Sequence, residues 1–226
     1  QTGANGGWID ASALTYKITR LPDSIVVAET TTGNEYIDNS ITKLNIYSYQ
    51  IQAITPDGAG PTATTDRLVM GPALTVPYRC NFATDDQFAL WNVIDANNDE
   101  YTWKRETTLA AAYYYYNEDG ETGGDDWLVS SPIHLEKNKI YRLKFKLQSY
   151  DVGYPEKVAV HLGTGASVAE QTTLLGDYEI ESNTFVEYKV ILPERLESGN
   201  YHISFHCHSE PYMFILYVTD VLLEEV

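Results

Sequence analysis

The stretch YYYYNEDGETGGDDWLVSSPIHL, residues 113–135, is the part of the chain that points most directly to its fold. Four tyrosines lead into an acidic, glycine-rich loop, and the loop delivers Asp125 and Asp126 onto Trp127 and a short apolar segment that stops before Pro132. Strand, carboxylate-rich loop and strand is the pattern in which an all-β domain builds a cation site or a ligand-facing rim. We therefore expect binding chemistry here rather than a hydrolytic centre.

The composition limits the possible partners. The 226 residues contain 15 Lys and Arg against 32 Asp and Glu, a net charge of −17. Nucleic acid is excluded as a partner, because its phosphates would be repelled. The acidity fits a soluble extracellular protein or one that meets divalent cations. Eighteen tyrosines and two methionines favour β-sheet faces and amphipathic binding surfaces.

The chain carries no sign of membrane insertion, since no apolar run reaches the roughly 20 residues that cross a bilayer. It shows no signal peptide, and its start, Gln1-Thr2-Gly3, resembles an internal cut. We expect any targeting segment, and upstream domains of the same polypeptide, to precede it.

The two cysteines, Cys80 and Cys207, form no CxxC motif, which excludes zinc-ribbon and thioredoxin-like sites. Both lie at positions of apolar alternation, so we expect buried thiols that act as small hydrophobic side chains. A disulfide between them is the alternative.

Short alternating segments dominate the first third of the chain. Residues 14–20 alternate with period two, and residues 47–54 put Tyr47, Tyr49 and Ile51 on one face. Residues 56–61, PDGAGP, are typical of a turn. Such strands predict an antiparallel β-sandwich. Further strands are expected over residues 24–29, 35–37 and 62–69.

The segments YKITR (16–20), YSYQIQA (47–53) and DGAG (57–60) resemble those of a fibronectin type III module over about residues 8–70. The resemblance implies that Tyr47 is a corner tyrosine whose hydroxyl bonds to the backbone. It also implies that two strands expected before Gly7-Trp8 are missing. An incomplete sandwich of this kind would expose apolar surface.

A break at Met70-Gly71-Pro72-Ala73 divides the chain into residues 1–72 and 73–226. The second part shows about ten short strands without βαβ alternation, which predicts a jelly-roll sandwich. The predicted fold class is therefore all-β, with an incomplete fibronectin type III-like sandwich followed by a jelly roll. Its strands are expected over residues 88–94, 140–147, 157–162, 185–192, 200–206 and 214–222, with a weak helix candidate over 167–175.

A second acidic loop follows residue 94. Asp95, Asn97 and Asp99 place oxygen ligands at alternate positions, as a calcium loop does. The loop is not an EF-hand, because the turn glycine and the glutamate at the twelfth position are missing. The alternative is a solvated turn, with the neighbouring tryptophans as core residues.

The segments WNVIDANND (91–99), DDWLVSSPIHL (125–135), YHISFHCHS (201–209) and LYVTDV (216–221) resemble the cleaved-adhesin domains. These are MAM-like jelly rolls of Bacteroidetes surface proteins and gingipain adhesin regions. The resemblance implies a secreted or cell-surface bacterial binding domain, often with structural calcium, that is not an enzyme. The chain departs from the family pattern at Cys80, at Thr219 and at residues 97–100, where the family favours acidic residues or an Asp-Gly-Asp-Gly loop. The candidate metal ligands are Asp95, Asn97, Asp99, Asp125, Asp126 and Asp220.

Catalytic signatures are missing. The sequence has no G-x-S-x-G elbow and no H-E-x-x-H motif. Asp125 and Asp126 would point to opposite faces of a strand, which is wrong for paired acid–base catalysis. His202, His206 and His208 share one face of a strand. His206 and His208 could bind a transition metal, or be outward polar residues of a half-exposed strand.

We predict extracellular recognition, without catalysis, of a host or matrix protein or of a glycan. The mechanism would be carbohydrate or protein binding by a rim of Tyr, Trp and carboxylates. Two alternatives stay open: an accessory module of a larger secreted peptidase or glycoside hydrolase, and a structural spacer. The candidate contact residues are Tyr114, Tyr116, Asp119, Tyr150, Asp151 and Tyr154.

Overall fold

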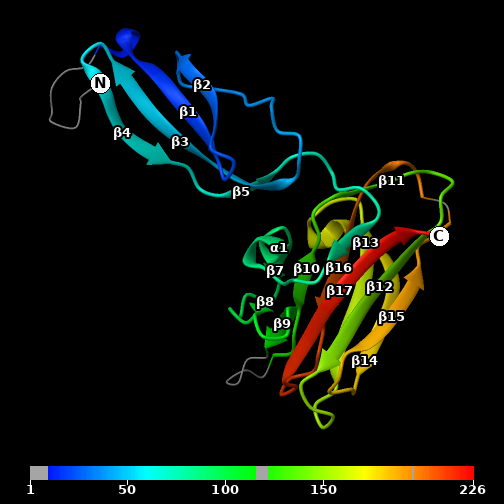
Figure 1. Ribbon diagram of the computed structural model, residues 1–226. Coiled ribbons are helices and arrows are strands. Elements are labelled where there is room, and N and C mark those ends of the chain that lie inside the picture. The colour runs from blue at the N-terminus through cyan, green and yellow to red at the C-terminus, as the bar shows by residue number, and fades with distance from the viewer. Residues whose placement is uncertain (1–9, 116–121, 195) are drawn as a thin grey trace. The chain divides into compact units, whose positions relative to one another are not determined.

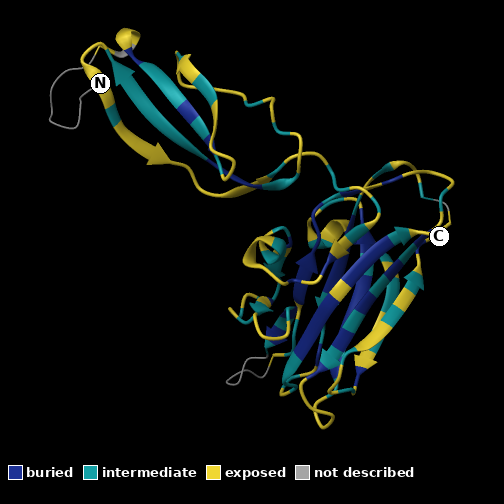
Figure 2. Cartoon of the chain, in the orientation of Figure 1, coloured by how far each residue is buried: buried dark blue, intermediate teal, exposed yellow. Residues whose placement is uncertain are grey.

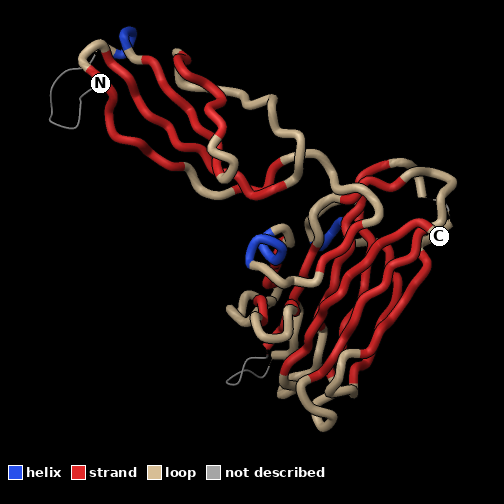
Figure 3. The backbone as a smooth tube through the Cα atoms, in the orientation of Figure 1, coloured by secondary structure: helices blue, strands red, loops and turns tan. Residues whose placement is uncertain are grey.

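The computed structural model describes residues 10–115, 122–194 and 196–226. The chain separates into two compact units, Gln1–Pro72 and Ala73–Val226. Both units are built almost wholly of β-strands (Figures 1 and 3). None of the helices in the described ranges is long and apolar enough to span a bilayer.

The first unit is one antiparallel five-stranded sheet in the order β2-β1-β3-β4, with β5 pairing β3. The alternation seen in the sequence places Ile18 opposite Ile51 across β1 and β3. Pro61 lies in the edge strand β4, where its missing N–H does not interrupt the sheet. The elements are the short helix η1 (Ala11–Ala13), β1 (Thr15–Leu21), β2 (Ile25–Thr31), β3 (Asn45–Thr55), β4 (Gly58–Thr64) and β5 (Leu68–Met70).

Two local expectations for this unit have different outcomes. The Tyr47 hydroxyl donates to the carbonyl oxygen of Lys43 at 3.0 Å, which confirms the predicted backbone bond. The strand expected at residues 35–37 does not form, and these residues lie in the connection between β2 and β3. The Asp38 carboxylate there accepts the backbone N–H of Ser40 at 2.8 Å, and such local bonds compete with sheet pairing.

One apolar face of this sheet has no second layer over it among the described residues. Tyr16, Ile18, Tyr49 and Ile51 line a depression of about 590 Å³ on that face. The strands of this unit are mostly half-buried or exposed in Figure 2. The buried apolar side chains of its described part are Leu14, Ile18, Ile46 and Tyr47.

A buried arginine braces the same unit. Arg20 is 4% exposed. Its guanidinium donates to Asp23 at 2.6 Å and to Asp38 at 2.9 Å, and lies 5.3 Å from the centre of the Tyr47 ring. Tyr49 also donates to Asp38, at 2.9 Å. Paired charges thus occupy space that a second sheet would otherwise fill with apolar side chains.

The second unit is a sandwich of two six-stranded sheets. The histidine sheet has the order β14-β13-β16-β10-β7, with β11 pairing β16; the lysine sheet has the order β15-β12-β17-β9-β8, with β6 pairing β17. The strands are β6 (Tyr78–Cys80), β7 (Asn92–Asp95), β8 (Lys104–Glu106), β9 (Ala111–Tyr115), β10 (Asp126–Val129), β11 (Ile133–Leu135), β12 (Tyr141–Ser149), β13 (Glu156–Gly163), β14 (Thr173–Ile180), β15 (Val186–Ile191), β16 (Gly199–Cys207) and β17 (Ile215–Glu225).

The core lies between these sheets (Figure 2). Every second residue of β12 is buried, among them Leu143, Phe145 and Leu147. Phe145 meets Phe205 of β16 edge to face, with ring centres 5.3 Å apart. The period-two pattern therefore points one face of each strand inward, as predicted for a sandwich.

Two segments differ from the predicted strands and helix. Residues 85–89 form the helix α1 (Asp85–Ala89), because the Thr84 hydroxyl caps it by accepting the N–H of Gln87 at 3.2 Å. The weak helix candidate is only the 3₁₀ turn η2 (Val168–Glu170), which leads into β14. Cys80 and Cys207 are buried free thiols in different sheets, which confirms the first reading of the cysteines and not the disulfide.

Candidate cation loop and aromatic rim

The acidic loop after β7 is folded around its own carboxylates. Asp95 is the last residue of β7 and pairs in register with Asp126, the first residue of β10. One oxygen of Asp95 accepts the N–H of Asp99 at 3.3 Å, and the other accepts the N–H of Glu100 at 2.9 Å. Asn98 adopts a left-handed conformation with φ +57°, which asparagine tolerates. The alternating acidic pattern therefore builds a tight turn.

The loop also holds the segment that precedes β10. The Asn97 side-chain amide donates to Asp99 at 3.2 Å and to the carbonyl oxygen of Gly123 at 3.1 Å. Asp99 accepts the N–H of Tyr101 at 2.9 Å. The two acidic segments that the sequence pointed to are thus joined by side-chain hydrogen bonds.

Asp126 is a buried carboxyl group with no exposed surface. Burial raises the pKa of Asp126 to about 7. The negative charges of Asp95 and Asp99 add to this rise, and the Thr102 hydroxyl offsets part of it. The Oδ1 atom of Asp126 and the Oδ1 atom of Asn97 are buried without a hydrogen-bond partner in the described structure. Unpaired buried oxygens are costly, so these two atoms mark a place that is suited to a cation.

The donor set at this place favours one class of metal. In the described ranges, no three Asp, Glu, His or Cys side chains are arranged to hold a metal ion by themselves. A cation here would need amide oxygen as well as carboxylate oxygen, and that mixture suits calcium rather than zinc. The residues that could supply these oxygens are Asn97 and Asp126, whose Oδ1 atoms are unpaired, with Asp95 and Asp99 beside them accepting the backbone bonds of the turn.

Two residues of the predicted metal set do not join these four. Asp125 points away from Asp126, as adjacent strand residues do, and accepts a bond from His206 Nε2 at 2.8 Å. Asp220 lies in β17 of the lysine sheet and pairs with Lys146 at 2.8 Å. Including Asp125 and Asp220 was wrong, because the fold places both outside the loop cluster.

Cys80 of β6 and Thr219 of β17 stand where the family pattern has acidic residues, and neither supplies a carboxylate for a second cation site. Cys80 supplies a buried thiol, and burial raises its pKa, so it stays protonated. The Thr219 hydroxyl donates to the carbonyl oxygens of Ala110, at 2.6 Å, and Asn81, at 3.3 Å. The single hydroxyl proton of Thr219 is therefore shared between these two carbonyl oxygens, mainly with that of Ala110.

The outer face of the histidine sheet gathers imidazoles around a tryptophan. The His206 ring stacks on Trp127, with ring centres 4.0 Å apart and planes 8° apart. His161 lies 5.0 Å from the same indole, and His208 bonds to Asp177 at 2.8 Å. Burial lowers the pKa of both His206 and His161. The sequence predicted the shared face of His206 and His208 but not the stack.

Aromatic side chains cluster in two loops at the end of the sandwich where β10 begins. Tyr150 and Tyr154 pack around Phe214, with ring centres 4.7 and 6.2 Å from its own. Tyr212 belongs to the same loop as Phe214. Tyr150, Tyr154 and Tyr212 are 54%, 48% and 57% exposed. We call Tyr150, Tyr154, Tyr212 and Phe214 the aromatic rim.

The predicted contact residues divide between surface and core. Tyr150 and Tyr154 belong to the aromatic rim, and exposed Asp151 shapes their loop by accepting the N–H of Gly153 at 2.7 Å. Tyr114 was a wrong choice, because it is 1% exposed and packs against Trp103 in the core. Alternation along β9 turns Ala112 and Tyr114 inward together. The other two predicted contacts, Tyr116 and Asp119, lie outside the described residues.

A buried glutamate that sequence reasoning missed supports the rim. Glu156 has no exposed surface, and it accepts the Ser209 hydroxyl at 2.5 Å and the Phe214 N–H at 2.6 Å. Burial raises its pKa to about 7, although these two bonds oppose the rise. Sequence reasoning also missed Tyr212 and Phe214 of the rim. The segment Pro211–Phe214, an aromatic loop between two apolar strands, could have indicated them.

The rim and the cation loop meet at one segment. Gly124 donates its N–H to the carbonyl oxygen of Ser209 at 2.9 Å, and Ser209 lies in the loop that carries Tyr212 and Phe214. Asn97 holds the neighbouring Gly123 from the cation-loop side. The two features are therefore connected through residues 123 and 124.

Comparison with known proteins places the second unit in a fold class. No family model matches the sequence, and no curated protein matches it. Among solved structures, the K1 cleaved adhesin domain of Lys-gingipain from Porphyromonas gingivalis W83 matches with a TM-score of 0.54 and 20% identity, covering 66% of this chain and 98% of that domain. The second unit has the cleaved-adhesin fold.

Two sister domains give the same result. The K3 cleaved adhesin domain of Lys-gingipain from Porphyromonas gingivalis W83 matches with a TM-score of 0.51 and 19% identity over 65% of this chain and 96% of that domain. The K2 cleaved adhesin domain matches with a TM-score of 0.52 and 14% identity over 66% and 99%. At these identities the comparison confirms the predicted fold resemblance and the all-β class.

Proposed function

We propose that this chain belongs to a secreted or cell-surface bacterial protein and that its second unit binds a protein or glycan, without catalysis, through the aromatic rim. The observation that supports the proposal is the exposure of Tyr150, Tyr154 and Tyr212, each about half accessible. Tyrosine supplies contact area at low conformational-entropy cost and a hydroxyl for hydrogen bonding.

The rim is held in place before any ligand arrives. Phe214 is fixed through its N–H by the buried Glu156, and Tyr150 bonds through its N–H to the carbonyl oxygen of Ile215 at 2.9 Å. Because the loops are tied to the sheets, little conformational freedom is left to lose on binding. Asp151 adds an exposed carboxylate that can accept hydrogen bonds from hydroxyl groups.

We propose calcium as a structural cation in the loop cluster, held by Asn97 and Asp126 together with Asp95 and Asp99. Bound there, the ion would supply positive charge that compensates a buried carboxylate. The protein's own contribution is to fix the loop against Gly123. Because Gly124 bonds to Ser209, ordering of this segment would also steady the rim.

Rim binding is tested by screening the full chain against glycan and matrix-protein arrays, beside the double variant Tyr150→Ala/Tyr154→Ala. The double variant should lose any ligand that the wild type captures. Tyr36→Ala is the matched control, because Tyr36 is a 41% exposed tyrosine of the first unit. A ligand that survives the rim substitutions would contradict the proposal, and a chain that captures nothing would be a spacer.

Calcium is tested by thermal unfolding with calcium and with EDTA. A ligand that binds only the folded state stabilises it by about 2.7 kcal/mol at 100 times its Kd. We expect calcium to raise the unfolding temperature of the wild type and of Asp125→Asn, but not of Asp126→Asn or Asp95→Ala. No rise at millimolar calcium would remove the ion from the proposal.

A second candidate is an accessory module of a larger secreted peptidase or glycoside hydrolase. The observation in its favour is that the three matching structures are domains of Lys-gingipain. A catalytic domain in the same reading frame would decide for it, while the rim experiment would stay valid for the module itself.

A further inference from the structure

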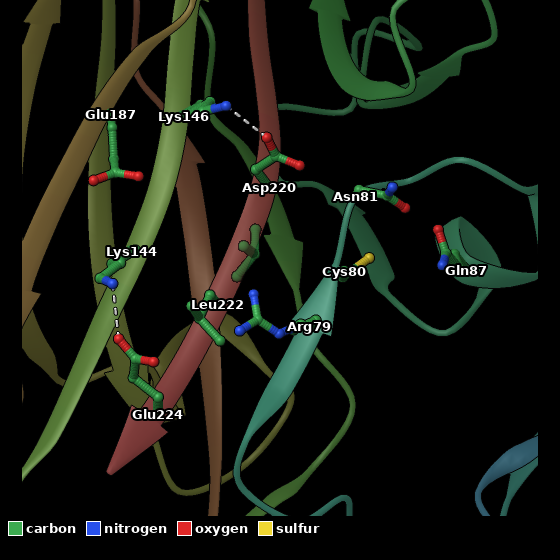
Figure 4. A pocket seen from close by; sticks show the side chains of 11 residues that line it. Arg79, Cys80, Asn81, Gln87, Lys144, Lys146, Glu187, Asp220, Leu222 and Glu224 are labelled. Atoms are coloured by element: carbon green, nitrogen blue, oxygen red, sulfur yellow. Dashed lines mark ion pairs between the residues drawn. The ribbon is translucent and has the colours of Figure 1, made fainter. Parts of the chain in front are cut away.

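A polar depression of about 630 Å³ lies on the outer face of the lysine sheet, away from the aromatic rim. Figure 4 shows side chains from β6, β12 and β17 pointing into it. Its charged lining residues are Arg79, Lys144, Lys146, Glu187, Asp220 and Glu224.

Basic side chains form a row across this face. Strand pairing places Lys189 of β15 opposite Lys144 of β12, Lys144 opposite Leu222 of β17, and Leu222 opposite Arg79 of β6. Neighbouring strands lie about 4.8 Å apart, so the three cations span roughly 15 Å. Like charges directly opposite each other destabilise a sheet. Lys189 thus lies opposite a like charge, and a bound anion beside it would weaken that repulsion.

The carboxylates of this face do not neutralise the row. Glu224 is shared between Arg142 and Lys144, at 2.6 and 2.9 Å. Asp220 is already paired with Lys146. Arg79 and Lys189, both exposed, have no ion-pair partner in the described part of the chain. The lining itself holds three cations and three carboxylates, the third being Glu187. Arg142 and Lys189, which lie beside the depression, bring the cations of this face to five on a chain whose net charge is −17.

The lining excludes two common kinds of ligand. Its apolar residues, Cys80, Val221 and Leu222, are at most 8% exposed, so a protein partner would find no apolar anchor. It contains no aromatic ring on which a neutral sugar could stack. The amides of Asn81 and Gln87 can bind hydroxyl groups beside the cations (Figure 4).

We propose that this depression, together with Lys189 at its side, binds an acidic saccharide. Its carboxylate or sulfate groups lie on Arg79 and Lys189, and its hydroxyls meet the amides and carboxylates of the lining. Arg79 can grip a planar carboxylate or a sulfate with two parallel N–H bonds. The proposal goes beyond the rim function, because the depression lies on the outer sheet face.

The test is calorimetric titration of the full chain at low salt with three probes: oligogalacturonate, which is carboxylated; dextran sulfate oligosaccharide, which is sulfated; and neutral dextran. We expect at least one acidic probe to bind and neutral dextran not to bind. Arg79→Ala should weaken binding about tenfold, the scale of one charge-assisted bond, and Arg79→Lys should recover part of the loss. Added salt should weaken binding further.

Two variants sharpen the assignment. Glu187→Gln removes a neighbouring carboxylate without changing the shape of the side chain, so it should tighten binding of the acidic probe. Lys17→Ala removes one positive charge from the first unit, outside the proposed site, and should leave binding within about twofold, since salt screens exposed charges that do not contact the ligand. Thermal unfolding checks that every variant is folded.

Three results would overturn the proposal. The first is that neither acidic saccharide binds. The second is that Arg79→Ala and Lys189→Ala bind the acidic probe as tightly as the wild type. The third is that a polyglutamate peptide or a single-stranded oligonucleotide binds as tightly as the saccharides. Tyr150→Ala/Tyr154→Ala should keep acidic-saccharide binding, so failure at the rim and failure here are distinguishable.

Discussion

The two units solve the same problem, an apolar sheet face, in opposite ways. The second unit covers that face with another sheet, so that Phe145 meets Phe205 across the interface. The first unit has one sheet and holds a paired guanidinium, Arg20, beside the apolar side chains. Strand alternation thus predicts which face of a sheet is apolar but not what covers that face.

The pKa shifts of buried carboxyl groups also differ between the two units. Burial by itself would raise the pKa of Asp38 in the first unit, but hydrogen bonds from Ser40, Tyr49 and Arg20 outweigh burial and hold it at about 2. In the second unit burial wins, and it raises the pKa of Glu156 to about 7. Asp38 accepts hydrogen bonds from three residues, of which the bonds from Ser40 lower its pKa most, whereas the more deeply buried Glu156 accepts only those of Ser209 and Phe214.

The first prediction concerns the covered core of the second unit. Phe205→Ala should lower the free energy of unfolding of the second unit by about 3–5 kcal/mol, because it deletes a ring from a closely packed interior. Ile51→Ala, on the open face of the first unit, should cost about 1 kcal/mol. Hydrogen exchange of each unit in the full chain measures both. Equal costs would mean that the first unit's face is covered in solution.

The second prediction concerns Arg20 and its ion pairs in the first unit. Arg20→Ala should destabilise the first unit by about 3–5 kcal/mol, because it leaves Asp38, whose side chain is 6% exposed, buried without its cation. Arg20→Lys keeps the charge but loses the fork geometry and should fall between wild type and alanine. If alanine were tolerated, the network would not be what replaces the missing layer.

The third prediction concerns the pH dependence of stability, which should have opposite signs in the two units. Glu156 is protonated in the folded state up to about pH 7 but only to about pH 4.5 when unfolded, so its contribution is complete below pH 4.5 and is lost as pH rises through 7. The second unit should therefore weaken by up to about 1.4 kcal/mol per pH unit for this group. Unfolding temperatures at pH 5 and pH 8 measure the trend.

Variants separate the groups responsible for that trend. Glu156→Gln should reduce the pH dependence and leave the part that Asp126 contributes, because the pKa of Asp126 is also raised to about 7. Exposed Glu187→Gln should not change the pH dependence. In the first unit, Asp38 has a lowered pKa, so its contribution is present above about pH 4 and is lost as pH falls through 2. A second unit that gained stability between pH 5 and pH 8 would contradict the assignment for Glu156.

The smallest effect concerns the surface. Lys17 and Glu29 of the first unit are 3.9 Å apart and largely exposed. Lys17→Ala should change the free energy of unfolding by less than about 0.5 kcal/mol, because solvent and salt screen such a pair. A cost that approached the cost of Arg20→Ala would show that exposure does not distinguish the two ion pairs.

The sequence predicted best those features that depend on alternation along a single strand. Alternation placed Leu143, Phe145 and Leu147 on one face of β12, and it pointed Asp126, the first residue of β10, and the preceding Asp125 in opposite directions. Both follow from the geometry of a single strand, which needs no knowledge of the partner strands.

The rest of the site needed the packing of distant segments. Alternation said that half of the tyrosine run is buried, but only the position of β9 in its sheet shows that Tyr114 is in that half. Asp220 was placed with the wrong acidic residues because only the topology separates the two sheets. The helix at residues 85–89 was signalled by Thr84 and Gln87, a cap and its partner three residues later.

The stack of His206 on Trp127 also makes the protein report on its own protonation. Protonated imidazole in face contact with an indole quenches its fluorescence, and neutral imidazole does so far less. Burial lowers the pKa of His206, so this imidazole becomes protonated only at pH values below the ordinary range for histidine. The emission of Trp127 should therefore fall only below that range. The unit thus contains an optical probe of its outer sheet face that requires no label.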